Sequence, residues 1–132
     1  MKQKKILVFG ASGQIGRHLI RKLSKNNCIV TAVTRNIHQK AYILRTQANA
    51  GYIKIVEASI FDEETINNLI SKNDICINLI GILYEKRKAN TFKNIHTTFP
   101  SIISKICEKY KLQQFIQLSS LGIDDAQDSN YA

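Results

Sequence analysis

The sequence predicts an α/β protein with a doubly wound parallel sheet, and three observations lead to that fold class. Short apolar runs alternate along the chain with segments whose apolar residues recur at helical spacing. The apolar runs are continuous rather than alternating, as expected of strands that are buried on both faces. The connections are short, so right-handed crossovers place helices on both faces of a sheet with strand order 3-2-1-4-5. The length of 132 residues suits one such domain, residues 1–132.

The individual elements carry start and stop signals that suit this order. Ile15, Leu19 and Leu23 form an apolar stripe on the first predicted helix. Asp62 can cap the third helix, and Pro100 makes the last helix restart or bend because proline lacks an amide proton. The predicted strands are 6–9, 29–33, 52–56, 74–80 and 115–118, and the predicted helices are 13–26, 39–50, 62–73 and 95–110.

A glycine-rich segment, Gly10-Ala11-Ser12-Gly13-Gln14-Ile15-Gly16, joins the first strand to the first helix. Dinucleotide-binding loops of the Rossmann fold occupy this position. Their first glycine allows a tight turn, the second lets the backbone approach a diphosphate, and the third lets the helix pack on the sheet. The first amides of the helix and its dipole then hold the anion. The residues expected to bind the cofactor here are Gly10, Ser12, Gly13, Gln14, Ile15 and Gly16. The alternative is a glycine turn without a ligand.

The end of the second predicted strand bears on the choice of nucleotide. An Asp or Glu there would accept hydrogen bonds from the ribose hydroxyls of NAD, but the sequence reads Val33-Thr34-Arg35-Asn36. The guanidinium of Arg35 offers several donors where a 2′-phosphate would lie, which favours NADP(H) and leaves NAD(H) as the second choice. Alternatively, Arg35 is a surface cation. After the third strand, the hydroxyl of Ser59 can contact the adenine.

Composition and charge narrow the class of partner. The chain has 19 Lys and Arg against 10 Asp and Glu, a formal net charge of +9. The basic residues fall in short groups without an RNP-like aromatic strand or zinc-ligand spacing, so we expect no nucleic acid and no metal. Cys28, Cys76 and Cys107 are dispersed, which is typical of buried, reduced thiols in a cytosol-like compartment. No apolar stretch reaches the roughly 18 residues of a transmembrane helix.

Four further segments carry a resemblance to a known family. They are Asn78-Leu79-Ile80-Gly81, Phe92-Lys93-Asn94-Ile95-His96, Phe115 to Gly122, and Ser129-Asn130-Tyr131. Together with the glycine loop, they resemble the nucleotide-binding accessory subunit of respiratory complex I (NADH:ubiquinone oxidoreductase) and its bacterial relatives. Those proteins are atypical members of the extended short-chain dehydrogenase/reductase superfamily.

The resemblance implies a tightly held NADPH with a mainly structural role, and complex I subunits as partners. It implies that Leu79, Ile80 and Gly81 pass beneath the nicotinamide-ribose, with backbone packing rather than side-chain chemistry. It also implies a cytoplasmic location or a peripheral one on the inner face of the respiratory membrane, which is the matrix side in a eukaryote. The positive charge would suit anionic lipid or acidic partner subunits at such a position.

The resemblance also bears on catalysis. Reductases of this superfamily use Tyr as acid/base, Lys to lower its pKa and Ser to orient the carbonyl. Ser119 and Tyr131 match the Ser and Tyr, but the Lys would follow four residues after Tyr131, and the sequence stops at Ala132. We therefore expect a non-catalytic, C-terminally truncated domain that lacks the later strands and the substrate region. The fifth strand would then be an exposed edge, with Ile116 and Leu118 uncovered. The alternative function is the N-terminal part of an atypical NADP-dependent reductase or sugar-nucleotide epimerase.

Overall fold

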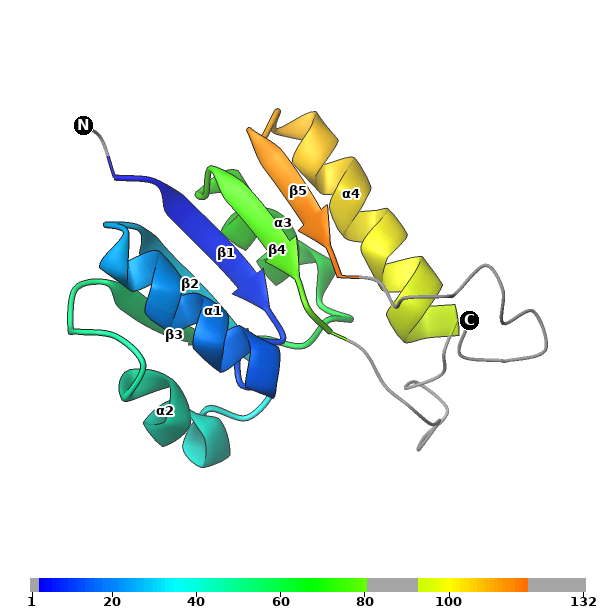
Figure 1. The fold of residues 1–132 in the computed structure, drawn as a ribbon. Coiled ribbons are helices and arrows are strands. Elements are labelled where there is room, and N and C mark those ends of the chain that lie inside the picture. The colour runs from blue at the N-terminus through cyan, green and yellow to red at the C-terminus, as the bar shows by residue number, and fades with distance from the viewer. Residues whose placement is uncertain (1–2, 81–92, 119–132) are drawn as a thin grey trace, which may run out of the picture.

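The computed structural model describes residues 3–80 and 93–118 and confirms the predicted fold class. Its strands are β1 (Lys5–Phe9), β2 (Ile29–Thr34), β3 (Ile53–Glu57), β4 (Ile75–Asn78) and β5 (Gln114–Gln117). They form one parallel sheet in the order β3-β2-β1-β4-β5, as predicted (Figure 1). The helices are α1 (Gln14–Lys25), α2 (Ile37–Arg45), α3 (Glu63–Ser71) and α4 (Phe99–Lys109), and a π-helical segment, η1 (Lys93–Thr98), precedes α4.

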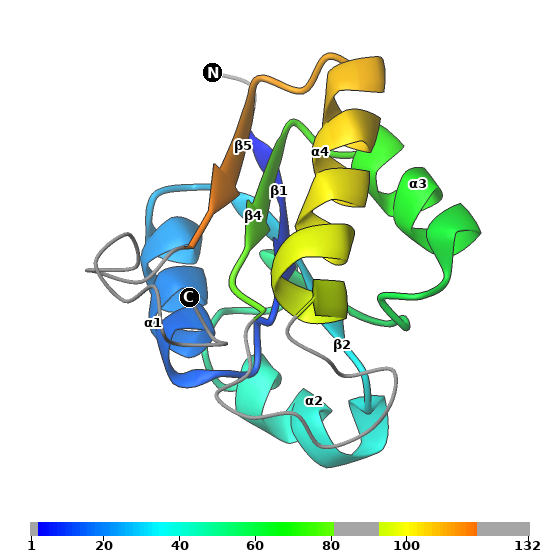
Figure 2. The same ribbon diagram turned by 90° about the vertical axis from the view of Figure 1, so that its right-hand side faces the viewer.

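The sheet separates two apolar layers, one on each of its faces. The central strand β1 divides its side chains between them: Ile6 and Val8 pack on the α1 and α2 side, and Leu7 and Phe9 on the α3 and α4 side. Figure 2 shows α1 on one side of the sheet and α3 and α4 on the other. All four of these side chains are buried, which explains why the sequence of this strand is continuously apolar rather than alternating.

Each helix seals its layer with a few large side chains. Ile20 of α1 and Leu44 of α2 are fully buried against one face of the sheet. On the other face, the ring of Phe99 in α4 meets Phe9 edge-on, with 5.3 Å between centroids and an interplanar angle of 86°. This geometry is the favourable one for an aromatic pair, and it fixes the start of α4 beside the carboxyl end of β1.

Several element boundaries differ from the predicted ones. The second helix begins at Ile37 rather than at residue 39, because the Asn36 side chain caps it by accepting a hydrogen bond from the Gln39 amide. It also ends at Arg45 rather than at residue 50. The fourth strand stops at Asn78 instead of residue 80, and the long segment 95–110 divides into η1 and α4 with Pro100 in the first turn of α4.

The cysteines and the last strand largely follow the expectations. Cys76 and Cys107 are buried, whereas Cys28 is only half-buried, which corrects the expectation for that thiol. A hydrogen bond with Cys107 and burial both raise the pKa of Cys76, so it is a neutral core thiol.

Among the described residues, β5 is an edge strand, and Ile116 and Leu118 are 39% and 45% exposed, as predicted.

Candidate functional site

The glycine loop lies where β1 joins α1, at the carboxyl edge of the sheet. Gly10 has a φ of +76°, and a Cβ atom there would lie 2.9 Å from the backbone nitrogen of Ile80. A Cβ on Gly16 would lie 2.5 Å from the carbonyl oxygen of Ala11. Neither position can accept a larger side chain without movement of backbone, since real Cβ atoms do not approach so closely. Two of the three glycines are therefore required by the fold itself.

Gly13 differs from the other two glycines. Its φ of −72° and ψ of 174° are open to any residue, and a Cβ there would meet only the Gly10 carbonyl oxygen, at an ordinary 3.5 Å. Gly13 is exposed and forms the N-cap of α1 without a side-chain cap. The fold alone gives no reason for a glycine here, whereas the close approach of a ligand to the backbone would.

The first turn of α1 keeps its hydrogen-bonding capacity free. The backbone amides of Gln14, Ile15 and Gly16 have no acceptor among the described residues, and the first turn contains no acidic side chain. Ser12 is half-buried, and its hydroxyl forms no hydrogen bond within the described part of the chain. The positive end of the helix dipole and these donors form a site for an anion. Ile15 adds an apolar side chain, 55% exposed, at its rim.

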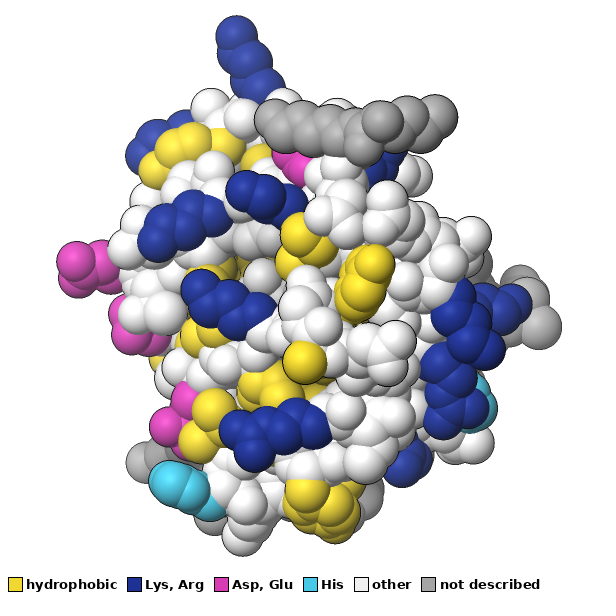
Figure 3. Space-filling view, turned by 90° about the vertical axis from the view of Figure 1, so that its left-hand side faces the viewer, with side chains coloured by type: hydrophobic (Ala, Val, Ile, Leu, Met, Phe, Trp, Pro, Cys, Tyr) yellow, Lys and Arg dark blue, Asp and Glu magenta, His cyan; other side chains and the backbone are white. Residues whose placement is uncertain are grey.

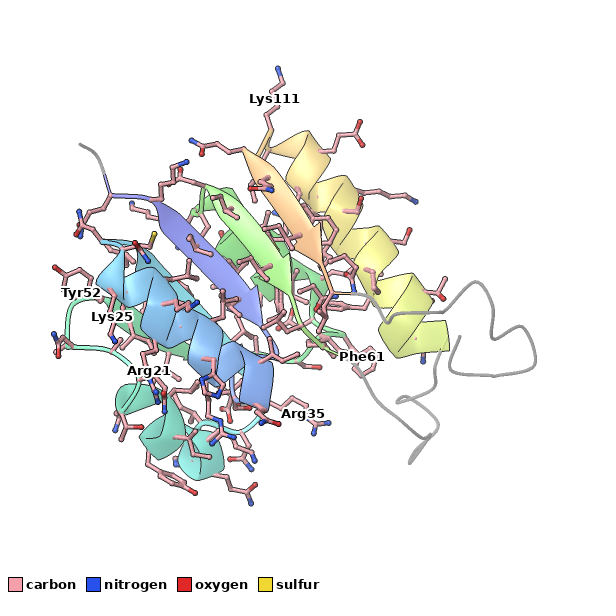
Figure 4. All side chains as sticks on the ribbon, in the orientation of Figure 1. Arg21, Lys25, Arg35, Tyr52, Phe61 and Lys111 are labelled. Atoms are coloured by element: carbon pink, nitrogen blue, oxygen red, sulfur yellow. The ribbon has the colours of Figure 1, made fainter. Side chains whose placement is uncertain are left out.

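Arg35 follows the last residue of β2 and lies at the same edge of the sheet. It is exposed, and its guanidinium has neither an ion pair nor a hydrogen bond with any described residue. Figure 4 shows Arg35 beyond the amino-terminal end of α1, at the same edge as Phe61. The adjacent Thr34 is buried and accepts a hydrogen bond from the Asn36 amide at 3.4 Å, which shapes the turn that carries Arg35.

A carboxylate that sequence reasoning missed lies beside this turn. Glu57 ends β3 and is paired in register with Thr34. Its Oε1 accepts a hydrogen bond from the Ile37 amide at 3.2 Å, so it helps to cap α2, two residues beyond Arg35. Sequence reasoning looked for a carboxylate that binds the ribose only at the end of the second strand, and it gave Glu57 no role. The signal that could have found Glu57 is the predicted strand order, which makes β3 the neighbour of β2.

The loop after β3 brings two side chains to the edge. Ser59 is exposed, and its hydroxyl oxygen accepts a hydrogen bond from the Phe61 amide at 3.1 Å, which leaves its proton free to donate. Phe61 is 53% exposed, and sequence reasoning gave it no role. An exposed aromatic ring immediately after a strand at the ligand-binding edge is a signal that could have singled it out.

The end of β4 is held by a buried amide side chain. Asn78 is fully buried, donates from Nδ2 to Oε1 of Gln117 at 2.8 Å, and accepts from the Ile80 amide at 3.1 Å. The Leu79 amide donates to the carbonyl of Phe9. These bonds curl the half-buried Leu79 and Ile80 toward the glycine loop, where Ile80 lies against Gly10. Their packing beneath a nicotinamide-ribose, which the resemblance implies, stays a prediction.

Two hollows lie in the described surface. The one near the candidate site measures 320 Å³ and extends from Phe61 toward the start of α4. It is lined by Ile60, Phe61, Glu63, Asn94, Thr98, Phe99 and Ile102. The larger one, of 440 Å³, lies between the end of α4 and the start of β5, which is the edge opposite the glycine loop. Of these two, the first lies at the carboxyl edge of the sheet, as the glycine loop does.

Several predicted site residues lie outside the described part of the chain. They are Gly81, Ser119 and Tyr131, and the same holds for the side chain of His96. Within residues 3–80 and 93–118, no group of three or more His, Cys, Asp or Glu side chains could hold a metal ion. No helix in those ranges is both long enough and apolar enough to cross a bilayer.

Comparison with protein families and curated proteins agrees with this geometry. A family model described as NAD(P)H-binding matches residues 10–132. The chain is 28% identical over 117 residues to the mitochondrial NADH-ubiquinone oxidoreductase 40 kDa subunit of Neurospora crassa. It is 29% identical over 115 residues to the mitochondrial NADH dehydrogenase [ubiquinone] 1 alpha subcomplex subunit 9 of Arabidopsis thaliana. These matches cover 89% and 87% of this chain, which spans 31% and 29% of the two relatives.

Solved structures share the same fold. The X-ray structure of Pen from Bacillus thuringiensis superposes with a TM-score of 0.81 at 15% identity, over 98% of this chain and 42% of that one. UDP-glucose 4-epimerase from Thermotoga maritima gives a TM-score of 0.72 at 26% identity, over 89% of this chain and 38% of that one. The β1–α1 junction and the strand order described above are thus those of a common nucleotide-binding architecture.

Proposed function

The chain belongs to the NAD(P)H-binding family, and from this membership we propose that it binds NADP(H) as a mainly structural module of an assembly related to complex I. One observation carries the proposal. At the β1–α1 junction, the amides of Gln14, Ile15 and Gly16 have no acceptor among the described residues, and the helix is capped by an exposed Gly13. A dinucleotide diphosphate supplies the missing acceptors and the negative charge that the helix dipole favours.

The proposal assigns the rest of the dinucleotide to residues at the ends of β3 and β4. Leu79, Ile80 and Gly81 would follow the nicotinamide-ribose, and Ser59 with Phe61 would contact the adenine. When bound, the cofactor could supply hydride chemistry, but the proposal assigns it a structural role. In that role, the protein's part is to hold the diphosphate at the head of α1 and to cover both ends of the nucleotide with apolar and hydroxyl groups.

The preference for NADP(H) rests on Arg35, whose guanidinium has no partner among the described residues. A planar guanidinium matches the oxygens of a 2′-phosphate and forms charge-assisted hydrogen bonds with them. Glu57 acts against this preference because its carboxylate, at the end of β3 and beside the start of α2, would repel a 2′-phosphate. Its hydrogen bond to the Ile37 amide turns one of its oxygens toward the helix end, which is why we give Arg35 the larger weight.

Calorimetric titration of NADPH and NADH tests this assignment. We expect Arg35→Ala to weaken NADPH binding by about tenfold or more, the value of a charge-assisted hydrogen bond, and to leave NADH binding nearly unchanged. Arg45→Ala is the matched control, since Arg45 is also an exposed arginine on the same stretch of chain but lies at the far end of α2. Equal losses for the two nucleotides would contradict the 2′-phosphate assignment.

The assembly part of the proposal draws on the names of the relatives, which are subunits of NADH-ubiquinone oxidoreductase. Its partners would be subunits of that enzyme, at the cytoplasmic or matrix face of the respiratory membrane. Native electrophoresis of the whole protein from its source tests this. We expect it to migrate with complex I and to carry NADP(H) that is not oxidised when carbonyl substrates are added.

A second candidate function is the N-terminal part of an atypical NADP-dependent reductase or sugar-nucleotide epimerase. The 26% identity to a UDP-glucose 4-epimerase favours it. Turnover of a carbonyl substrate or of a nucleotide sugar by the whole protein would decide for this candidate. A lysine at the fourth position after Tyr131 in a longer coding sequence would supply the acid/base pair that such chemistry needs.

A further inference from the structure

The charges of this chain are segregated along the sequence. Residues 1–56 contain 11 of the 19 Lys and Arg residues and none of the 10 Asp and Glu residues. The first acidic side chain is Glu57, at the end of β3. These 11 cations therefore belong to the part of the chain that contains β1, α1, β2, α2 and β3, whereas the other eight, including Lys86 to Lys88, come later in the sequence.

The fold places five of these cations in one layer on the α1 and α2 side of the sheet. Helices α1 and α2 both pack on the same face of the sheet, through Ile20 and Leu44, so their outer sides face away from the sheet together. Figure 3 shows Lys and Arg side chains spread over the side of the molecule where these helices and the β3 edge lie, with Asp and Glu toward its margins. We call the exposed cations of this layer the basic layer. Its members are Arg21, Lys22 and Lys25 of α1, and Lys40 and Arg45 of α2.

The two helices of the basic layer are tied to each other. The guanidinium of Arg21 donates to Oε1 of Gln47, just after α2, at 2.7 Å. Figure 4 shows Arg21 and Lys25 along the side of α1 that faces α2. Tyr42, an aromatic side chain 67% exposed, projects from α2 between Lys40 and Arg45 in sequence. The layer is thus a fixed surface that combines cations with one exposed aromatic.

We propose that the basic layer docks this protein on an anionic lipid bilayer. Five exposed cations without an acidic neighbour on α1 or α2 repel one another, and each Lys or Arg near an anionic leaflet gains about 1 kcal/mol. Clusters of this size on helices are typical of surfaces that bind acidic lipids. Lipid headgroups can move laterally to match fixed cations. Tyrosine side chains are enriched in the headgroup region of membranes. A folded acidic protein would need a complementary surface of matching shape.

The basic layer is separate from the nucleotide site. The site lies at the carboxyl edge of the sheet, at Gly13 and Arg35, whereas Lys22, Lys25 and Arg45 lie in the last turns of their helices. Substitutions in those last turns are expected to leave NADPH binding unchanged, so the docking proposal and the proposed function can fail independently.

Sedimentation with lipid vesicles tests the proposal. The probes are phosphatidylcholine vesicles with and without phosphatidylserine, at low and physiological salt. We expect binding to the phosphatidylserine vesicles alone, and weaker binding at the higher salt because the screening length falls to about 8 Å. The triple variant K22E/K25E/R45E should lose about a hundredfold in vesicle affinity, as three cations at an anionic surface imply.

A matched variant separates this face from net charge. K72E/K105E/K109E reverses three exposed cations, one at the end of α3 and two in α4, on the other side of the sheet, and changes the net charge equally. We expect it to bind vesicles nearly as the parent does, with both triples folded by thermal melting and still binding NADPH. If the Glu triple does not fold, K22Q/K25Q/R45Q replaces it with half the charge change. No binding to the acidic vesicles, equal losses in both triples, or tighter binding to poly-L-glutamate or duplex DNA would overturn the proposal.

Discussion

Two helices begin at the carboxyl edge of the same sheet, and their first turns are built in opposite ways. In the first turn of α3, side chains of the protein itself supply the acceptors and the negative charge. Asp62 accepts hydrogen bonds from the Thr65 amide at 3.3 Å and from the Thr65 hydroxyl at 2.6 Å, and the acidic residues Glu63 and Glu64 follow it. The first turn of α1 has a glycine cap and no acidic residue. Both helices face the same physical need, since every helix leaves its first amides without internal partners.

The difference shows where the protein leaves room for a ligand. Caps and acidic first-turn residues stabilise a helix, so a helix without them gives up stability unless something else supplies the acceptors. The first amides of α2 also have acceptors within the protein, namely the side chains of Asn36 and Glu57. Of the three helices α1, α2 and α3, only α1 lacks, among the described residues, a side chain that accepts from its first amides. It begins at the loop whose second glycine the fold does not require. The comparison therefore supports our proposal that the β1–α1 junction holds a ligand, on energetic grounds as well as by its sequence pattern.

The largest expected effect comes from making α1 like α3. Gly13→Asp fits the backbone, because φ is −72° and a Cβ there makes only an ordinary contact. Its carboxylate would cap the amides of α1 and repel a diphosphate. We expect NADPH binding to fall by about a hundredfold or more, given the strength of hydrogen bonds to charged groups. The melting temperature should stay the same or rise, because an Asp cap exceeds a Gly cap by a few tenths of a kcal/mol.

This substitution has a neutral counterpart. Gly13→Asn adds a cap of the same size without the charge, so its loss of NADPH affinity should be smaller than that of Gly13→Asp. Titration and melting of both variants give the measurement. Undiminished NADPH binding by a folded Gly13→Asp protein would show that the head of α1 does not hold the diphosphate.

Gly16 sharpens the contrast within the loop itself. A Cβ at Gly16 would lie 2.5 Å from the Ala11 carbonyl oxygen and 2.7 Å from that of Gly10, so Gly16→Ala forces the start of α1 away from the loop. We expect a loss of about 1–3 kcal/mol in the free energy of unfolding, as for other overpacked sites, measured by denaturant titration. Gly13→Ala is the matched control and should cost less, because it removes only the better N-cap propensity of glycine and causes no overlap. Equal destabilisation by both would mean that the two glycines serve the same structural purpose.

Much of the fold could be predicted from sequence because its signals are local. The continuous apolar character of strand β1 reflects burial on both faces, and Asp62 is the predicted cap of α3. The end of α2 could not be predicted, since Ala48 and its neighbours continue a helical pattern that the chain abandons near Thr46. Tertiary packing overrides propensity at such ends.

The candidate site was predictable where it follows the chain and not where it depends on neighbours across the sheet. The glycine loop and Arg35 are contiguous with their strands, so spacing alone located them. Glu57 caps a helix that is 20 residues distant in sequence, and Asn78 bonds to Gln117 across 39 residues. Both interactions depend on the register of adjacent strands, which no local pattern encodes.

The smallest expected effect concerns α3 alone. Hydrogen bonds from the Thr65 hydroxyl and amide hold the pKa of Asp62 below its ordinary value of 3.8. Because the folded-state pKa is lowered, the carboxylate stabilises the fold above pH 3.8, and this contribution disappears as the pH falls through the folded-state pKa. Asp62→Ala should thus lower the melting temperature slightly at neutral pH and have little effect in acid, without changing NADPH affinity. Asn36→Ala, which removes the uncharged cap of α2, should cost the same at both pH values; a parallel pH dependence in the two variants would show that ionisation of Asp62 is not the cause.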